Sequence, residues 1–264
     1  MTRAAAPVAE AIAAIDDHGK KVQAMFSDIS HGYDLANRLM SLGTDIRWRR
    51  RAVAQLLPSR PEQATNGPRP QILDLCAGTL DSTRAIHRTF PTADLVGGDF
   101  SAGMLGVGAA LLTPTERERI TPQHMDAHEL PLKDQQLDAI FCAFGVRNLS
   151  NVPRATREAL RVLKPGGQLT VLEFFRPRAL VTRIFHAIYN RTVLPLVGWM
   201  CTGNLDAYLY LPRSIAAFRD VADYAKTLEC AGFQDVRVEP LTFGVASIVR
   251  ARRPDEAFEP EVSP

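Results

Sequence analysis

Short apolar runs alternate with helical stretches through the middle of the chain. A rhythm of this kind requires right-handed crossovers and a mostly parallel sheet, whose strands are apolar on both faces. The predicted strands are Gln71–Cys76, Asp94–Val96 leading into Gly97-Gly98-Asp99, Ile120–Met125, Leu137–Ala143 and Gln168–Phe174. The predicted helices between them are Ser82–Phe90, Ser101–Leu112 and Pro153–Leu163, with Pro165-Gly166-Gly167 closing the last one.

The same rhythm resumes near the end of the chain. A helix is predicted over Val221–Ala231, followed by two strands over Val236–Leu241 and Val245–Arg250. A short turn at Thr242–Gly244 joins these strands. Such a terminal hairpin places one antiparallel strand in an otherwise parallel sheet.

Residues 176–219 interrupt the pattern. Within them Leu180, Ile184, Ile188 and Thr192 recur at helical spacing. Two interpretations stay open and are compatible with each other. The segment is an extra helical layer packed on the core, or a lid over an apolar substrate pocket that also touches a membrane.

The remaining segments frame a single domain. Residues 1–19 are expected to form a flexible tail, and 20–57 to form helices broken near Gly32 and Gly43. The proline-rich stretch 58–70 is expected to be an exposed loop. One domain is therefore predicted over 20–250, with a disordered tail over 251–264.

Charge and cysteine usage exclude several classes of protein. A formal net charge of +2 gives no broad nucleic-acid signature. The cysteines lack zinc-ribbon and redox-motif spacing, which favours a reduced, cytoplasmic chain. The sequence has no signal-peptide core and no uncharged apolar stretch long enough to span a bilayer. His124 and His128 are expected at a strand end, and no metal site is predicted.

Acidic residues lie at or near the ends of three successive predicted strands. The turn after the first strand, Leu73–Asp81, carries one glycine rather than the G-x-G-x-x-G that a pyrophosphate needs. S-Adenosylmethionine has no phosphate, so this turn suits it better than a dinucleotide. Asp74 is a candidate for its ammonium group, Asp99 for its ribose and Asp126 for its adenine amino group. For Asp74 and Asp126, capping of turns or helix starts is the alternative.

Several ordered motifs resemble the ubiquinone/menaquinone-biosynthesis C-methyltransferases of the UbiE/MenG type, which are class I methyltransferases. The resemblance covers about Val22 to Arg250, and Phe144–Asn148 and Asp206–Leu211 are its most discriminating segments. It implies a Rossmann-like α/β fold with a seven-stranded, mostly parallel sheet, one antiparallel strand, a helical N-terminal segment and a helical lid. The other matching segments are Met25–Ser30, Tyr33–Asn37, Leu73–Asp81, Leu163–Gly167, Leu172–Phe174, Ala231–Phe233 and Thr242–Val245.

The resemblance also implies a reaction. The enzyme would methylate a ring carbon of a prenylated quinol, either demethylmenaquinol or 2-polyprenyl-6-methoxy-benzoquinol, and release S-adenosylhomocysteine. A ring carbon becomes nucleophilic when the adjacent hydroxyl loses its proton, so a base or a phenolate-stabilising cation is required. No metal is expected.

The resemblance assigns candidate roles to individual residues. Arg147, Asn148 and Tyr33 are the candidate catalytic residues, and Tyr208 and Tyr210 join Arg147 as candidate substrate contacts. For Arg147 a structural pairing with a carboxylate is the alternative, and for the tyrosines it is core packing. For Asp126 a contact with the substrate instead of adenine is the alternative. The candidate cofactor residues are Asp74, Cys76, Ala77, Gly78, Thr79, Asp99, Phe100, Met104, Asp126, Ala127 and Phe144.

One residue departs from the family pattern. Leu80 stands where the family usually has glycine, and a side chain there disfavours a positive φ. We expect a tolerated variation; a narrower methionine end of the pocket, with weaker cofactor affinity, is one other interpretation. A non-catalytic cofactor-binding subunit of a quinone-biosynthesis complex is the alternative.

A polyprenyl substrate also implies a route to the bilayer. The 176–219 segment and the basic cluster around Trp48, formed by Arg47, Arg49, Arg50 and Arg51, are candidate peripheral contacts on the inner face of the cytoplasmic membrane. For the cluster, a solvated helix face is the alternative.

A homodimer or a biosynthetic complex is a further candidate assembly. A methyltransferase of secondary metabolism that acts on soluble phenols, and more distantly an NAD-dependent oxidoreductase, are the competing enzyme classes.

Overall fold

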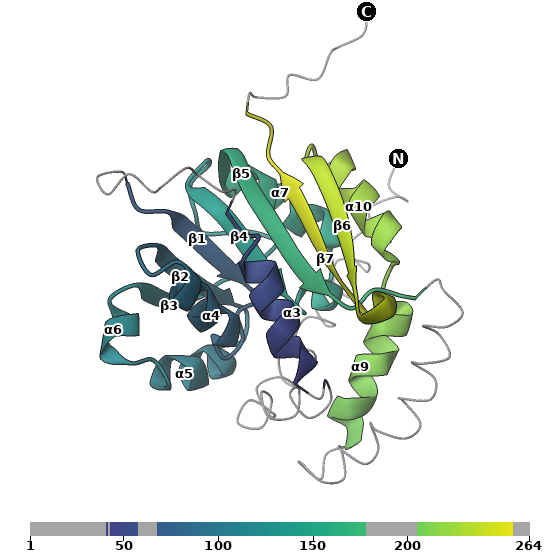
Figure 1. The fold of residues 1–264 in the computed structure, drawn as a ribbon, viewed down its shortest axis with the longest axis horizontal. Coiled ribbons are helices and arrows are strands. Elements are labelled where there is room, and N and C mark those ends of the chain that lie inside the picture. The colour runs from purple at the N-terminus through teal and green to yellow at the C-terminus, as the bar shows by residue number, and fades with distance from the viewer. Residues whose placement is uncertain (1–40, 42, 58–67, 178–204, 256–264) are drawn as a thin grey trace, which may run out of the picture.

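A seven-stranded sheet forms the centre of the computed structural model, which describes residues 41, 43–57, 68–177 and 205–255 (Figure 1). Its strand order is β3-β2-β1-β4-β5-β7-β6. The strands are β1 (Gln71–Leu75), β2 (Asp94–Asp99), β3 (Ile120–His124), β4 (Leu137–Ala143), β5 (Leu163–Glu173), β6 (Gln234–Leu241) and β7 (Ala246–Arg252).

The pairing of the strands confirms the predicted mixed sheet. All pairs from β3 to β5 are parallel, with Ile72 of β1 opposite Leu95 of β2 and Ala139 of β4. Strand β7 is antiparallel to both of its neighbours, β5 and β6, and it is therefore the one antiparallel strand. Because the chain order reverses beside β1, the carboxyl ends of β1 and β4 flank the place where ligands bind in such sheets.

Helices cover both faces of the sheet (Figure 1). Buried residues of α7 and α10 pack on one face, and those of α3, α4 and α5 pack on the other. Two short 3₁₀ helices, η1 (Val146–Asn148) and η2 (Thr242–Gly244), follow β4 and β6. The α-helices are α3 (Thr44–Val53), α4 (Asp81–Thr89), α5 (Ala102–Ala110), α6 (Pro114–Arg117), α7 (Val152–Val162), α9 (Leu205–Ala217) and α10 (Val221–Cys230).

Successive side chains along each strand point to opposite faces of the sheet, so the core consists of two layers. Ile72 belongs to the layer under α3 and α4, while Leu73 and Leu75 belong to the layer under α7 and α10. Successive side chains of a strand point to opposite faces, so an unbroken apolar run serves both layers. Full burial of each such Leu or Ile side chain contributes about 1.5–3 kcal/mol.

Two predicted boundaries are wrong. Strand β5 begins at Leu163, directly after α7, so Pro165-Gly166-Gly167 lie inside the strand instead of closing the helix. Gly166 adopts a φ of 73°, and the register against β4 shifts between Leu137 and Ala139, as a β-bulge does. Strand β7 continues to Arg252, so the ordered sheet extends past residue 250.

Helix α6 was not predicted. The chain leaves α5 at Ala110 and starts again at Pro114, where Thr113 and Glu116 form a reciprocal capping box. Proline at the first helical position and this capping box together start a helix of a single turn.

Several expectations fall outside the described residues. They concern the tail at 1–19, the helices before residue 41, the loop at 58–67, most of the 176–219 segment and the end of the chain after residue 255. Within the described ranges, no helix has the length and apolar character needed to cross a membrane.

Candidate functional site

The loop after β1 turns sharply at the carboxyl edge of the sheet. Cys76, Gly78 and Leu80 all have positive φ angles, of 59°, 55° and 63°. The amide of Ala77 donates to Gly98 O at 3.0 Å, and that of Leu80 donates to Ala77 O at 2.9 Å. This tight turn brings the backbone of the loop to the edge of β2 and leads directly into α4.

Asp99, at the end of β2, ties this loop to the next helix. Its Oδ2 accepts from the amide of Gly78 at 2.8 Å, and its Oδ1 accepts from the amide of Ser101 at 2.7 Å. Burial raises the pKa of the Asp99 carboxyl, and these amide donors oppose the rise. A carboxylate oxygen has more than one lone pair, so Asp99 retains the capacity to accept from a ribose hydroxyl.

Asp74 is a buried carboxylate with one unsatisfied oxygen. It lies within β1 and is 1% exposed. Thr83 of α4 donates to its Oδ2 at 2.6 Å, while its Oδ1 has no hydrogen-bond partner among the described residues. Burial raises its pKa to about 7, against the lowering effects of the Thr83 hydrogen bond and the charge of Arg49. An unsatisfied buried acceptor is costly, so the oxygen fits an ammonium group or a water that a ligand brings.

Two apolar residues finish this part of the site. Met104 is buried, and a Cβ on Gly78 would lie 3.1 Å from its Cε, so the thioether covers the glycine of the loop. The Phe100 ring stacks on the His124 ring with 5.8 Å between centroids. Thr79 and Ala77 are buried at the same edge.

Cys76 contributes a protonated thiol. A hydrogen bond with Cys142 of the neighbouring strand, together with burial, keeps its pKa well above the ordinary range. A thiol in this state is a small apolar lining group and a poor nucleophile. Cys76 therefore stays a candidate lining residue of the cofactor site.

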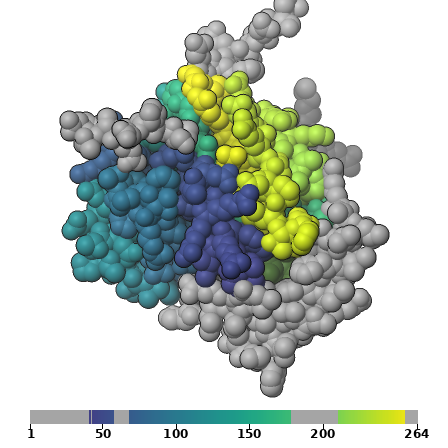
Figure 2. All heavy atoms as spheres, viewed as in Figure 1, coloured from purple at the N-terminus to yellow at the C-terminus, as the bar shows by residue number. Residues whose placement is uncertain are grey.

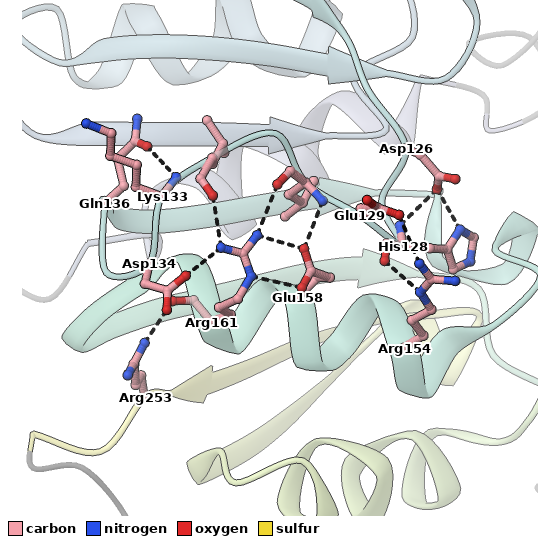
Figure 3. A network of polar contacts seen from close by, with 12 residues as sticks. Asp126, His128, Glu129, Lys133, Asp134, Gln136, Arg154, Glu158, Arg161 and Arg253 are labelled. Carbon is pink, nitrogen blue, oxygen red and sulfur yellow. Dashed lines mark hydrogen bonds and ion pairs between the residues drawn. The ribbon is translucent and has the colours of Figure 1, made fainter.

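The loop after β3 carries Asp126 and Ala127. The strand ends at His124, so Asp126 lies two residues beyond it, while Ala127 is buried. Oδ1 of Asp126 accepts from the backbone amide of His128 at 2.8 Å and lies 2.6 Å from its ring Nδ1 (Figure 3). His124 instead lies 2.9 Å from Phe100 O through Nε2. Among the described residues no group of three metal-ligating side chains occurs.

An arginine-centred network of α7, which the sequence did not reveal, holds this loop (Figure 3). Arg161 forms a bidentate pair with Glu158 at 2.9 and 2.8 Å and pairs with Asp134 at 2.7 Å. The same guanidinium donates to the carbonyls of Leu130 and Leu132 at 3.0 and 2.9 Å. Five donors in one planar group suit a loop with unpaired carbonyls, because each donor has a fixed direction.

The segment after β4 forms an aromatic stack. Phe144 has a φ of 58°, and its ring stacks on Phe174 with 4.7 Å between centroids. Its amide donates to Leu172 O at 2.8 Å, which continues the pairing of β4 with β5. Trp48 of α3 packs edge-on against Phe174 at 6.0 Å.

Arg147 pairs with a buried carboxylate that sequence reasoning missed. Its Nη1 lies 2.8 Å from Glu173 Oε1 and donates to Phe144 O at 2.6 Å. Its Nε donates to Ser214 of α9 at 3.3 Å, and its guanidinium carbon lies 5.8 Å from the Phe174 ring centroid. Of the two roles left open for Arg147, the structure shows the carboxylate pairing. The Leu-Glu-Phe motif was the only signal in the sequence that pointed to Glu173.

Asn148 and Tyr210 are joined by a hydrogen bond between their side chains. The Tyr210 hydroxyl donates to Asn148 Oδ1 at 2.9 Å and links η1 to α9. In Figure 1, α9 lies beyond the ends of the central strands. Tyr208 is on the same helix, but its side chain and the whole of Tyr33 lie outside the described residues.

The Leu80 side chain lies in the hydrophobic core. The side chain is fully buried in the layer that includes Ile86 and Leu105. A Cβ on Gly97 would lie 2.4 Å from Leu80 Cδ2, and one on Gly108 would lie 2.7 Å from Leu80 Cγ. These two glycines leave the space that Leu80 fills.

Two of the four arginines around Trp48 form ion pairs within the protein, so the four do not make up a single exposed basic patch. Arg49 is largely buried and pairs with Asp81 at 2.8 Å. Arg51 pairs with Glu239 of β6. Trp48 is buried and donates through Nε1 to Thr242 at 3.0 Å, so α3 lies against the β6–β7 turn (Figure 2). Only Arg47 and Arg50 of the four remain as exposed side chains without an ion pair among the described residues.

Similarity to known proteins extends over most of the chain. The chain matches the model of the ubiE/COQ5 methyltransferase family over residues 14–253. A demethylmenaquinone methyltransferase of Thermus thermophilus is 41% identical over 230 residues, which cover 87% of this chain and 100% of that protein. The ubiquinone/menaquinone biosynthesis C-methyltransferase UbiE of Geobacter sulfurreducens is 36% identical and covers 89% of this chain and 89% of its own length.

Solved structures show the same architecture. A SAM-dependent methyltransferase of Thermotoga maritima, described as a possible histamine N-methyltransferase, aligns with a TM-score of 0.58 at 17% identity. The alignment covers 87% of this chain and 98% of that one, and at this identity it shows the fold alone. The expected class I methyltransferase fold is thereby confirmed. From the family model and these relatives it follows that the chain belongs to the ubiE/COQ5 methyltransferase family.

Proposed function

We propose that this methyltransferase transfers the methyl group of S-adenosylmethionine to a ring carbon of a prenylated quinol. The observation that carries the cofactor assignment is the unsatisfied Oδ1 of buried Asp74, beside a loop without the glycines that a pyrophosphate needs. The substrate assignment follows from relatives named for demethylmenaquinone or ubiquinone/menaquinone biosynthesis.

Three carboxylates and one loop would hold the cofactor. Asp74 suits its ammonium group, Asp99 its ribose hydroxyls and Asp126 its adenine amino group, each through an oxygen able to accept a further hydrogen bond. Gly78 lets the backbone of the loop approach closely, since its φ is 55°. When bound, the cofactor supplies an electrophilic methyl group on a sulfonium. No metal takes part in this proposal.

The chain's own residues would align the quinol and control its proton. Asn148 and Tyr210 form a hydrogen-bonded pair able to orient a ring hydroxyl or a water beside it. Arg147 contributes a fixed positive charge over the Phe174 ring, where it favours a phenolate. Glu173 holds that charge in place, so it is a positioning residue. Tyr33 and Tyr208 stay candidates for closing the pocket.

The buried position of Leu80 weakens the argument that this chain is a non-catalytic cofactor-binding subunit. Its side chain fills core space between Gly97 and Gly108, so it does not argue against methyl transfer. Cytoplasmic location, a contact with the membrane surface through residues 176–219, and a homodimer or biosynthetic complex are parts of the same proposal.

Mass spectrometry of quinones tests the proposal directly. Cells without the protein should accumulate a quinone lighter by one methylene, and its ring would distinguish a benzoquinol from a naphthoquinol substrate. Purified protein should transfer a labelled methyl group to a short-chain prenylated quinol. An unchanged quinone pool together with transfer to soluble phenols alone would contradict the proposal.

A further inference from the structure

The imidazole of His128 connects Asp126 to Asn151, the N-cap residue of α7. Nδ1 lies 2.6 Å from Asp126 Oδ1, and Nε2 lies 3.1 Å from the backbone nitrogen of Asn151. A backbone amide can only donate, so Nε2 accepts and carries no proton. The ring proton therefore lies on Nδ1 and is donated to Asp126.

This arrangement uses one oxygen of Asp126 and leaves the other available. Oδ1 accepts both the amide and the imidazole of His128, while Oδ2 makes no hydrogen bond with the described part of the chain. The Asp126 side chain is 47% exposed, whereas that of His128 is 15% exposed. A carboxylate fixed through one oxygen and open at the other is prepared to accept a donor from a ligand.

The anchor of His128 is itself fixed. Arg154 donates through Nε to His128 O at 2.9 Å, and Asn151 caps α7 by accepting from the Arg154 amide at 3.0 Å. Figure 3 shows Arg154 of α7 facing the loop that carries Asp126 and His128. The ring and the backbone of His128 are thus both held by the same helix end, which restricts the orientation of Asp126.

We propose that His128 is a positioning residue that sets the purine selectivity of the cofactor site. By holding Oδ1 of Asp126, it aims Oδ2 at a donor on the six-position of the purine, which adenine supplies as an amino group. A purine with a carbonyl there would place acceptor against acceptor, which is repulsive. This inference rests on the proposed function, because it takes S-adenosylmethionine as the ligand.

Calorimetry with two nucleosides tests the selectivity. The probes are S-adenosylhomocysteine and its inosyl analogue, which carries a carbonyl in place of the amino group. Wild type should prefer the adenosyl form, and His128→Ala should reduce that preference by about tenfold, as expected for one charge-assisted hydrogen bond. His128→Asn, whose amide can replace the Nδ1 donor, should recover part of the preference.

Controls separate the possible failures. Lys133→Ala changes the same β3–β4 loop at an exposed side chain, and it should leave the preference unchanged. Failure of wild type to bind S-adenosylhomocysteine refutes the proposed function and this inference with it. If wild type binds and Asp126→Ala loses the preference while His128→Ala keeps it, the role of His128 alone is refuted. Nitrogen-15 NMR of wild type should find Nε2 unprotonated in the neutral ring, and a protonated Nε2 refutes the arrangement without any variant.

Discussion

Arg147 Nη1 lies 2.8 Å from Glu173 Oε1, and both side chains are buried at the carboxyl edge of the sheet. The pair also receives a donor from the backbone, because the Arg147 amide lies 3.2 Å from Glu173 Oε2. A buried charge that loses its partner is strongly destabilising, so this pair combines a structural role with a candidate catalytic one.

Removing one member of the pair should therefore have two effects. Arg147→Ala should lower the free energy of unfolding by about 3–5 kcal/mol, since Glu173 keeps an uncompensated buried charge. It should also lower turnover by about 10²-fold or more with cofactor affinity nearly unchanged. Chemical denaturation, steady-state rates and calorimetry measure the three quantities.

The double variant Arg147→Met, Glu173→Leu separates these effects. Apolar replacements of a buried ion pair are often neutral in stability, so most of the lost stability should return. Turnover should stay low if the guanidinium favours the phenolate. Recovery of turnover along with stability would assign Arg147 a structural role only.

Cofactor affinity should depend on pH through Asp74. Its pKa is raised from 3.8 to about 7 by burial, so it is mostly protonated below that pH. An ammonium group prefers the carboxylate, and affinity for S-adenosylmethionine should fall by up to about tenfold per pH unit below pH 7 and level off above it. Asp74→Asn should bind more weakly and show a flat profile. A pH-independent affinity in wild type would refute the assignment of Asp74 to the ammonium group.

The raised pKa of Asp74 should also make the stability of the cofactor-free protein depend on pH. The folded state binds more protons than the unfolded state between pH 4 and about 7, since the folded pKa of Asp74 is the higher one. The contribution of Asp74 to stability therefore decreases as the pH rises through this window. In Asp74→Asn this component of the pH dependence of denaturation should be absent.

Leu80→Gly should lower stability while preserving cofactor binding. The cavity left by a buried leucine costs about 2–5 kcal/mol, and relief of the left-handed backbone returns about 1–2 kcal/mol. Gly97→Ala should destabilise wild type, because the new Cβ would lie 2.4 Å from Leu80 Cδ2. In the Leu80→Gly background the same alanine should be better tolerated, and additive effects would contradict the packing of these two residues.

Tyr210→Phe should lower kcat/KM for the quinol and leave the affinity for the cofactor nearly unchanged. The variant removes the hydroxyl that donates to Asn148, a neutral hydrogen bond worth about 0.5–1.5 kcal/mol. We expect kcat/KM for the quinol to fall by roughly three- to tenfold with an unchanged dissociation constant for S-adenosylhomocysteine. Asn148→Ala should add little to this loss, because both variants remove the same contact.

Liposome flotation tests the membrane contact. Binding to anionic vesicles should survive Arg49→Gln, because Arg49 is engaged with Asp81 and Asp45 inside the protein. Arg50→Gln removes an exposed charge and should weaken binding by about 1 kcal/mol at low salt. Absence of flotation both with and without a prenylated quinol would remove the membrane contact from the proposal.

The sequence by itself determined the strands, their order of appearance and the candidate cofactor residues. Apolar runs such as Leu137–Ala143 specify a buried strand locally, and their alternation with helices restricts the sheet to a parallel topology. The αL backbone at Leu80 and the bulge at Gly166 were not predicted correctly, because they depend on what packs beside them. Motif order was enough to indicate the family.

Only the tertiary structure decided which side chains act together. Glu173 lies 26 residues from its partner Arg147, His128 lies 23 residues from Asn151, and Leu80 fills the space beside Gly97. Such partners become neighbours because separate strands and helices meet at one edge of the sheet. The periodicity of apolar residues along the chain does not indicate which distant residues meet there. The physical reason is that periodicity reports which face of an element is buried, whereas the identity of the partner depends on the register and packing of distant elements.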